Sequence, residues 1–344
     1  MSTGLSASDR AAAKQVIAPF RAALYDFDLR ALQSAMEKTF SPDALIRLAY
    51  PFETLESPHA LVSKAFSPLS NAMPDFERRD TIVMAGRTAA GDIWVGCLGY
   101  YTGKFARGFL DIPPTGHFAT MRYHEFFRIE SGAVIEFQAL WDIPELMHQA
   151  GAWPMAPQLG RAWYPAAPAT QNGLSIENKD ADHADRSLQL VSAMLDGLSK
   201  FATGGVEAME LAKYWHPRCS WYGPFGIGAC RGIEGFRNWH QIPFLNGMPD
   251  RKGTGGKGGG FFADGDFVAV TGWPNMSATI KNDGWMGIAP ADQKITMRSL
   301  DFWRCENGMI RENWVLVDLL NVYAQIGVDV LARMREFNKA RAPF

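Results

Sequence analysis

The chain has 344 residues, of which 47% are hydrophobic and 20% charged, and its formal net charge is −2 at pH 7. This composition is typical of a globular protein, and the acidic balance argues against a nucleic-acid partner, which would require a basic surface. No apolar run reaches the roughly 18 residues of a membrane span, and the first residues lack the apolar core of a signal peptide. We therefore expect a cytoplasmic protein without a membrane partner.

Helices are predicted first along the chain. Ser8 to Tyr25 begins with a Ser/Asp cap and places its apolar residues on one face, which predicts an amphipathic helix. Asp28 to Lys38 predicts a second helix. Pro58 to Leu69 predicts a third, because Ser57 and Pro58 stand where helix starts favour these residues. Residues 44–50 predict a strand between the second and third helices.

Strands follow the three helices. Four runs rich in β-branched and aromatic residues are separated by turns that contain Gly or Pro, and they span residues 81–87, 92–101, 118–129 and 133–141. A short helix over residues 145–150 closes this segment and ends at Gly151. Helices followed by a largely antiparallel sheet predict the α+β class.

A long repeat organises the whole chain. Residues 120–151 return as residues 296–327, without a gap, at a spacing of 176 residues. Twelve of the 32 aligned positions are identical, where chance would give about two. A period of this length indicates whole domains rather than a solenoid unit. We expect one domain in residues 1–151, a linker in residues 152–181 and a second domain in residues 182–344.

The linker is rich in Pro and Ala but contains Trp153, Trp163 and Tyr164. These aromatic residues are too apolar for a free tether, so we expect the linker to lie along a domain surface. After it, residues 184–201 and 206–213 predict the long and the short helix of the second copy.

Cysteine and histidine usage excludes the common metal and disulfide patterns. Four cysteines are scattered without a CxxC pair, which predicts buried free thiols in a reducing compartment; they are Cys97, Cys219, Cys230 and Cys305. The seven histidines form no HExxH motif. We expect no metal and no cofactor.

Two aspartates end the last long strand of each copy. Alternate residues of a strand share a face. The residues in phase are Glu136, Gln138 and Leu140 before Asp142, and Glu312, Trp314 and Leu316 before Asp318. A carboxylate among apolar neighbours is partly desolvated, which raises its pKa and makes it a better base at neutral pH.

Each of these aspartates also directly precedes a short predicted helix, and Asp is a preferred helix N-cap. A catalytic base and a helix cap are therefore both open interpretations. Carboxylate oxygens that point into a closed pocket and are free of backbone N–H groups would favour the base. Oxygens bonded to the following helix, beside a cavity filled with aromatic side chains, would favour the cap.

The motifs of the first copy resemble the SnoaL-like polyketide cyclase or ester cyclase family, of the nuclear-transport-factor-2-like superfamily. The motifs that carry the resemblance are Met73-Pro74-Asp75, Thr102-Gly103-Lys104-Phe105, Pro113-Pro114-Thr115-Gly116, FRIESGAVIE at 127–136, Trp141-Asp142 and LMHQAG at 146–151. The resemblance covers about residues 10–151 and, more loosely, residues 184–335.

The resemblance implies a cone in each copy, in which a curved antiparallel sheet wraps over about three helices and encloses a pocket. In characterised members one pocket aspartate acts as general acid/base for an intramolecular aldol closure, without metal or cofactor. Asp142 and Asp318 fall on that position. Single-domain relatives commonly dimerise through their sheets, so the tandem chain is expected to form a pseudo-dimer with itself. A further homo-oligomer stays open.

The second copy departs from the family pattern. It has Trp273-Pro274-Asn275 and Ala289-Pro290-Ala291 in place of the two turn motifs, and a glycine-rich loop at residues 253–260. His124 is matched by Leu300, so the two pockets are not chemically equal. A further open interpretation is that the first copy is the working one and the second serves as its permanent pseudo-dimer mate.

Several residues are candidates for binding a substrate in these pockets. They are His124, Gln138, Tyr100, Trp94, Met73, Trp314 and Met248. Most aromatic residues are expected in the core, and a few should line an apolar cavity of the kind that small hydrophobic ligands occupy. His124 is expected to be a structural histidine, with a hydrogen-bonding group of the pocket as the alternative.

Together these features predict a cofactor-free enzyme of the cyclase or isomerase type. It would act on a small hydrophobic carbonyl compound, such as a polyketide-like ester, with Asp142 as the preferred base and Asp318 as the second candidate. The analogy with an aspartate base in an apolar pocket rests on the general principle of pKa tuning. The alternative is a non-catalytic protein that binds a small molecule.

Overall fold

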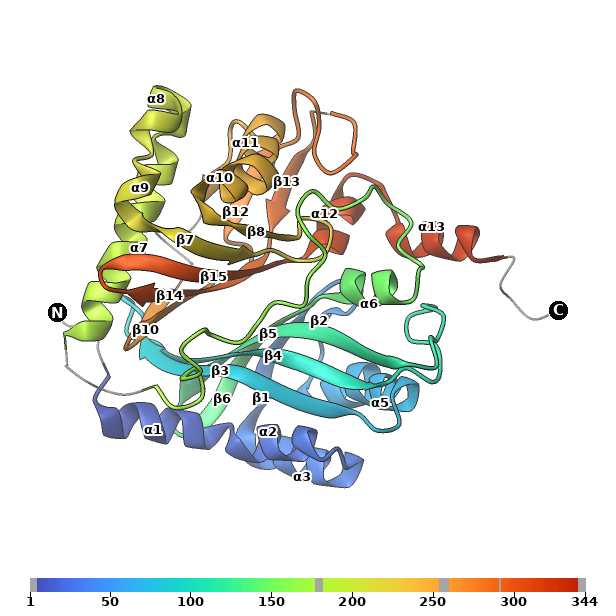
Figure 1. Ribbon diagram of the computed structural model, residues 1–344. Coiled ribbons are helices and arrows are strands. Elements are labelled where there is room, and N and C mark those ends of the chain that lie inside the picture. Colours follow the sequence, from blue (N-terminus) through green and yellow to red (C-terminus); the bar gives the residue numbers. More distant parts are fainter. Residues whose placement is uncertain (1–4, 177–181, 254–259, 291, 340–344) are drawn as a thin grey trace.

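A computed structural model describes residues 5–176, 182–253, 260–290 and 292–339. It contains two units of the same design, each with a six-stranded sheet and helices on one side (Figure 1). The two sheets face each other in the middle of the molecule, and the helices α1–α3 and α8–α11 lie on opposite outer sides. The predicted α+β class and tandem arrangement are confirmed.

The first half consists of α1 (Ala7–Val16), α2 (Ala18–Tyr25), α3 (Leu29–Thr39), β1 (Phe40–Leu48), β2 (Glu53–Leu55), α4 (Pro58–Leu61), the π-helical turn η1 (Val62–Phe66), α5 (Ser67–Ala72), β3 (Glu77–Arg87), β4 (Ile93–Lys104), β5 (Phe118–Glu130), β6 (Ala133–Trp141) and α6 (Ile143–Gln149). Its strand order is β2-β1-β6-β5-β4-β3, and only β1 and β6 pair in parallel.

The second half consists of α7 (His183–Ser199), α8 (Phe201–Ala208), α9 (Leu211–Tyr214), β7 (Trp215–Tyr222), β8 (Ala229–Arg231), α10 (Gly232–Phe236), the π-helical turn η2 (Arg237–Gln241), α11 (Ile242–Gly247), β9 (Lys252–Gly253), β10 (Gly260–Asp264), β11 (Phe267–Thr271), β12 (Met276–Thr279), β13 (Lys294–Met297), β14 (Ser299–Glu306), β15 (Met309–Val317), α12 (Leu319–Gln325) and α13 (Val330–Phe337). Its large sheet has the order β10-β11-β14-β15-β7-β8. In the described part of the chain, no helix is both long and apolar enough to cross a membrane.

Three predicted helices differ from the structure in detail. The helix expected over residues 206–213 is divided between the end of α8 and α9, and Glu210 between them has a left-handed backbone conformation. The helix expected over residues 8–25 is two helices that meet at Ile17, because Pro19 at the start of α2 lacks the N–H of a continuous helix and its ring clashes with the preceding turn. The helix expected over residues 58–69 contains a π-helical turn and continues to Ala72. Residues 254–259 of the glycine-rich loop lie outside the described part.

Three long strands of the first half correspond to pairs of shorter strands in the second. The registers show this, because Met276 of β12 pairs with Met297 and Gly253 as Tyr101 of β4 pairs with Met121 and Arg78. The break between β11 and β12 contains Trp273-Pro274, where proline has no N–H to donate to a ladder.

The two sheets pack against each other through what we call their outer faces, and each sheet is covered on its inner face by the helices of its own half. The outer-face core draws apolar residues from both halves: Ala49, Ile82, Met84, Trp94, Leu98, Phe126 and Leu140 from the first, and Tyr222, Ala229, Phe262, Phe267, Ala269, Leu300, Phe302, Trp314 and Leu316 from the second. Gly86 is needed here, because a Cβ on it would lie 2.7 Å from the main-chain oxygen of Ala263.

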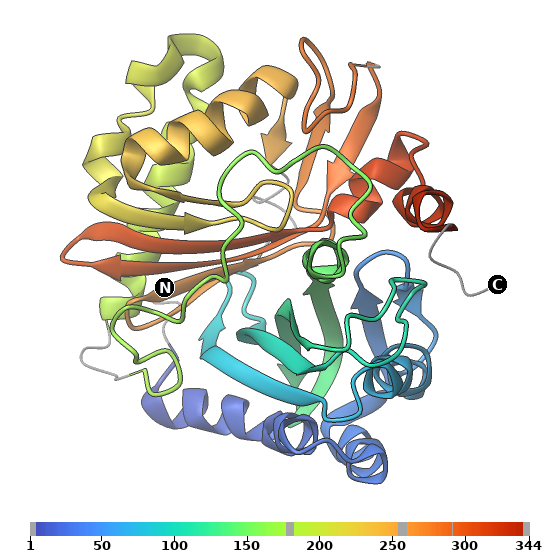
Figure 2. The same ribbon diagram turned by 45° about the vertical axis from the view of Figure 1, so that its right-hand side comes forward.

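The described part of the linker binds both halves. Tyr100 of the first half donates to the Pro165 carbonyl at 2.8 Å, and Trp314 of the second donates to the Ala166 carbonyl at 3.0 Å. Figure 2 shows the linker rising from α6 over the second half and returning beside β3. The four cysteines are free; Cys97, Cys219 and Cys305 are buried, and Cys230 is partly exposed.

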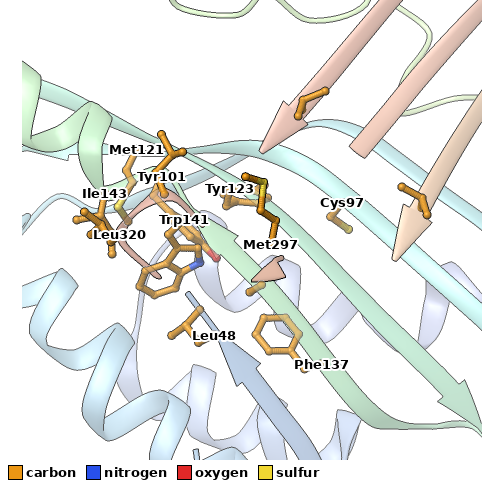
Figure 3. Close-up of a cluster of buried hydrophobic side chains, with 14 of the residues drawn as sticks. Leu48, Cys97, Tyr101, Met121, Tyr123, Phe137, Trp141, Ile143, Met297 and Leu320 are labelled. Atoms are coloured by element: carbon orange, nitrogen blue, oxygen red, sulfur yellow. The ribbon is translucent and has the colours of Figure 1, made fainter. Parts of the chain in front are cut away.

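The inner face of the first half is filled. Leu48, Phe137 and Trp141 lie between the strands and the helices (Figure 3), and they surround a buried ion-pair network. Arg78 donates to Glu125 at 2.5 Å and to Asp80 at 2.9 Å. The remaining contacts of the network are Tyr101 and Trp141 on Glu125, Tyr123 and Arg21 on Asp80, and the Arg78 guanidinium over the Tyr123 ring at 4.2 Å.

Replacing Arg78 by methionine is expected to destabilise the first half by about 3 to 5 kcal/mol, because it leaves the buried Glu125 carboxylate without a cation and Asp80 with Arg21 alone. Urea unfolding followed by tryptophan fluorescence measures the loss. Arg79→Met is the matched control, since the Arg79 side chain is 58% exposed and pairs with Glu77 on the surface; its expected loss is below about 0.5 kcal/mol. Equal losses for the two variants would contradict the structural role of the network.

Candidate functional site

Asp142 and Asp318 both cap the helices that follow them. Asp142 accepts a hydrogen bond from the Glu145 amide at 3.3 Å, and Asp318 accepts one from the Asn321 amide at 3.2 Å. Both side chains are almost fully buried. The cap interpretation is therefore correct for both, while a catalytic role for either remains a prediction.

The second oxygen of each aspartate is bound by the other half of the molecule. Asp142 accepts from the Phe225 amide at 2.9 Å, and Asp318 accepts from the Tyr50 amide at 3.0 Å. These equivalent contacts lie at opposite ends of the interface, as an approximate two-fold relation requires. The aspartates therefore meet the other half at the sheet edge, and do not look into the interior of their own cone as predicted.

An arginine of the same sheet completes each arrangement. Arg122 lies 3.4 Å from the Asp142 carboxylate, and Arg298 lies 3.2 Å from that of Asp318. Burial nevertheless raises the pKa of Asp142, and it raises that of Asp318 to about 6, although the arginines and backbone amides oppose the shift.

The predicted substrate-binding residues are distributed over several places. His124, Trp94, Gln138 and Trp314 lie on the outer faces, where His124 contacts the Leu300 carbonyl through its Nδ1 atom at 2.5 Å. Burial holds the pKa of His124 well below its usual value, so its ring is neutral. This environment fits the structural interpretation of His124.

Three further residues that were candidates for binding a substrate are also packed in the interior. Tyr100 stacks on Tyr164 of the linker with ring centroids 4.0 Å apart. Met73 and Met248 are fully buried in the inner-face core of their halves. Trp94 and Gln138 line a pocket of about 590 Å³ at the interface, so the predicted set does not form one site.

Asp142 lines a different pocket, of about 370 Å³, at one end of the interface. Its wall includes Arg122 from β5, Glu145 from α6, Phe225 from the loop after β7, and Tyr164 from the linker. Burial, and then the Asp142 charge, raise the pKa of the Glu145 carboxyl to about 8. Sequence reasoning missed Glu145, because its position in the first turn of α6 is an ordinary one for an acidic residue.

The inner face of the second half has lost the network that fills the first. The strand registers place Gly253 at the position of Arg78, Met276 at that of Tyr101, Ser299 at that of Tyr123, Asp301 at that of Glu125 and Val317 at that of Trp141. The residues of the first half are all buried, whereas Met276, Asp301 and Val317 keep part of their surface exposed.

Asp301 takes the position of Glu125 on this altered inner face. It alternates along β14 with Leu300 and Phe302 of the outer-face core, so it points to the inner face. Ser299 donates to its carboxylate at 2.5 Å, and in the described part of the chain no lysine or arginine pairs with it. Burial raises the pKa of Asp301 to about 7.

Polar groups with unused hydrogen-bonding capacity lie in the same half. The Nε1 atoms of Trp285 and Trp303 and the Nδ1 atom of His240 are buried, and no described residue bonds to them. His240 stacks on Trp221 with ring centroids 4.0 Å apart, and burial lowers its pKa to about 3. The two indole groups supply neutral N–H donors in surroundings rich in aromatic side chains. Among the described residues, no cluster of three His, Cys, Asp or Glu side chains has a geometry for a metal ion.

Comparison with known protein families shows which family the second half resembles. Residues 202–326 match the family model of the SnoaL-like polyketide cyclase. This part of the chain belongs to that family. The match falls on the copy in which the sequence motifs resemble the SnoaL-like family more loosely, and it includes Asp301, which the motif comparison did not single out.

Solved structures of SnoaL-like and related proteins resemble single halves of the chain. A putative hydroxylase, AclR, from Streptomyces galilaeus is 21% identical, with 43% of this chain and 87% of that chain covered and a TM-score of 0.36. A putative SnoaL-like polyketide cyclase from Jannaschia sp. CCS1 is 19% identical (42% and 94% covered, TM-score 0.35). TsrD from Streptomyces laurentii is 20% identical (42% and 97% covered, TM-score 0.34). A search of curated protein sequences found no match.

Replacing Asp142 or Asp318 by alanine is expected to lower the free energy of unfolding by about 2 to 4 kcal/mol, because each change removes a helix cap and the acceptor for a buried amide and an arginine. Urea unfolding measures the loss. Asp28→Ala is the matched control, since exposed Asp28 caps α3 alone, and its expected loss is about 1 kcal/mol. Losses no larger than that of the control would contradict the interface role.

Proposed function

We propose that the second half is an acid/base catalyst that acts on a small hydrophobic carbonyl compound, with Asp301 as the residue that carries the proton. The proposal replaces Asp142 and Asp318 as the preferred bases. It keeps the predicted reaction class, a cyclase or isomerase reaction without a cofactor. The first half then serves as the structural mate of the catalytic one.

One observation supports this assignment most strongly. At equivalent positions the first half holds Glu125 in a closed network with Arg78, while the second half has Asp301 at the position of Glu125 and Gly253 at that of Arg78. The Glu125 carboxylate is enclosed by its partners and is not accessible to a substrate. Asp301 has no ion-pair partner among the described residues, and burial raises its pKa to about 7 although the charge of Arg122 opposes the shift, so it titrates near the working pH, as a general acid/base requires.

The reaction proceeds without any other reactant. The Asp301 carboxylate removes a proton from the carbon next to a substrate carbonyl, and the bonding electrons move to that carbonyl oxygen. The enolate carbon attacks a second carbonyl of the same molecule, so one carbon–carbon bond forms and one alkoxide appears. The alkoxide takes the proton back from Asp301, and the product is an isomer of the substrate.

Other residues of the second half offer groups of the kinds that this reaction requires. The enolate oxygen requires neutral hydrogen-bond donors in a site of low polarity, and the indole N–H groups of Trp285 and Trp303 are of this kind. The rings of Trp221 and Phe236, 5.9 Å apart, offer apolar surface for the hydrocarbon part of a substrate.

Proton abstraction can be tested without the natural substrate. The purified chain is expected to accelerate deuterium incorporation from D₂O next to the carbonyl of simple aryl alkyl ketones, followed by NMR. Asp301→Asn should lower the rate by about 100-fold or more, the usual contribution of a general base. Asp142→Asn and Asp318→Asn should retain most of it. Exchange that survives Asp301→Asn and disappears in Asp142→Asn would contradict the assignment, and ketone binding without exchange would favour the non-catalytic binder.

The pH dependence gives an independent check. The exchange rate is expected to rise with pH and to level off above about pH 7, where Asp301 is ionised, and this step should be absent in Asp301→Asn.

The contribution of Asp301 to the stability of the folded protein should fall over the pH range in which the exchange rate rises. A carboxyl pKa raised on folding stabilises the protein below its unfolded value and loses that contribution as pH rises through the folded value. Asp301→Asn should therefore gain stability relative to the wild type between about pH 4 and pH 7. A parallel stability curve for the two proteins in chemical denaturation would contradict the raised pKa.

A further inference from the structure

The two ends of the interface are equivalent in fold but not in chemistry. We call the end with Asp318, Arg298 and Tyr50 the closed end, and the end with Asp142, Arg122 and Phe225 the open end. The open end contains the pocket of about 370 Å³. Comparing the two ends shows what this pocket lacks.

A side-chain carboxylate completes the closed end. Glu53, the first residue of β2, accepts from the Arg298 guanidinium at 2.5 Å and from the Asn321 side-chain amide at 3.2 Å. An arginine and a neutral amide thus hold one carboxylate group between the two halves.

The open end has no such carboxylate. Leu48 pairs with Glu53 in the first half, and the equivalent Gly223 bonds to Gly228 in the second, so Gly228 stands at the position of Glu53. Glycine is required there, because the backbone has φ = +83° and a Cβ would lie 2.8 Å from the main chain of Gly160 in the linker. Gly160 of the linker therefore occupies the space that a Cβ atom at position 228 would need, and the pocket of about 370 Å³ lies next to it.

The partners of that missing carboxylate are present. Arg122 corresponds to Arg298, and its buried Nε–H group donates to no described residue. Glu145 corresponds to Asn321, since both follow the capping aspartate by three residues. Glu145 is partly exposed in the pocket, and one of its oxygens accepts from the Arg122 amide at 3.0 Å.

We propose that the open end binds a small organic carboxylate, whose carboxylate group takes the place that Glu53 takes at the closed end, between Arg122 and Glu145. This site is separate from the Asp301 site and does not depend on the function proposed for it. The apolar part of the ligand would lie against Phe225, Trp163 and Tyr164, which line the same pocket.

The charges around the pocket favour an anion over a cation. Two arginines, Arg122 and Arg161, line it, and the Arg122 Nη2 atom is held by the Gly223 and Val315 carbonyls at 2.7 and 3.1 Å. Glu145 has a pKa of about 8 and is mostly protonated at pH 7, so it can donate to a carboxylate as Asn321 donates to Glu53. The other titratable groups near it are Tyr100 and Tyr164, which remain neutral because burial raises their pKa, and His148, which lines the pocket.

Calorimetric titration of the full chain with benzoate, and with benzamide as its neutral analogue, tests the proposal. Benzoate should bind at pH 7 with one site per chain, and benzamide should bind at least tenfold more weakly. Since only protonated Glu145 supports binding, the benzoate affinity should fall about tenfold between pH 7 and pH 9. Absence of benzoate binding, or equal affinity for benzamide, would overturn the proposal.

Two variants at position 145 sharpen the test. Glu145→Gln keeps a neutral donor of the same shape, so benzoate should bind at pH 7 and lose little affinity at pH 9. Glu145→Ala should weaken binding about tenfold at pH 7. A pH dependence that persists in Glu145→Gln would overturn the role of Glu145.

Controls at the other sites separate this pocket from them. Asp301→Asn should leave benzoate binding nearly unchanged, because Asp301 makes no hydrogen bond or ion pair with Arg122 and only a longer-range charge interaction links the two. Glu53→Gln weakens the closed end of the interface and should also leave the benzoate affinity unchanged. If Glu53→Gln reduces the affinity as much as Glu145→Ala, the effect comes from loosening of the interface, and the proposal is overturned.

Discussion

Burial of both faces of each sheet is the constraint on which the rest of this structure depends. An isolated cone buries one face under its helices and leaves the other to solvent or to a partner, whereas here the outer faces form a second core shared by both halves. Phe126 and Phe302 meet across that core with ring centroids 5.1 Å apart. Polar groups at the edge of the core must then find partners across the interface, which is what Asp142 and Asp318 do.

The same constraint explains what the sequence could and could not predict. The duplication, the α+β class and the order of helices and strands follow from the repeat and from residue patterns, and the capping of α6 follows from Asp142 itself. The face of the sheet toward which each side chain points does not follow from the sequence. Alternation marks two faces of a strand, but when both faces are apolar it gives no sign of which is inner. The alternation of residues before Asp142 therefore predicts a pocket for side chains that lie on the outer face, as Leu140 does.

Asp301 was missed for a related reason. In the aligned repeat it matches Glu125, which reads as a conservative acidic pair. The difference lies in the neighbours, since Glu125 is bound by Arg78, whereas Gly253 and Met276 stand at the positions of Arg78 and Tyr101 in the second half. The Met-Pro-Asp motifs at 73–75 and 248–250 already align Arg78 with Gly253, but the contact of Arg78 with Glu125 across the sheet becomes visible only in the structure. Tertiary context therefore decides whether a buried acid is a structural ion-pair partner or an available proton carrier.

Joining the two halves in one polypeptide has a consequence for how this architecture can change. In a symmetric homodimer every substitution appears twice, so a residue that improves one end of the contact alters the other end as well. In this chain Glu53 and Gly228 occupy equivalent places yet differ completely, and so do Arg78 and Gly253. A single heritable change therefore acts once, which leaves one half free to acquire chemistry while the other retains the packing that holds the molecule together.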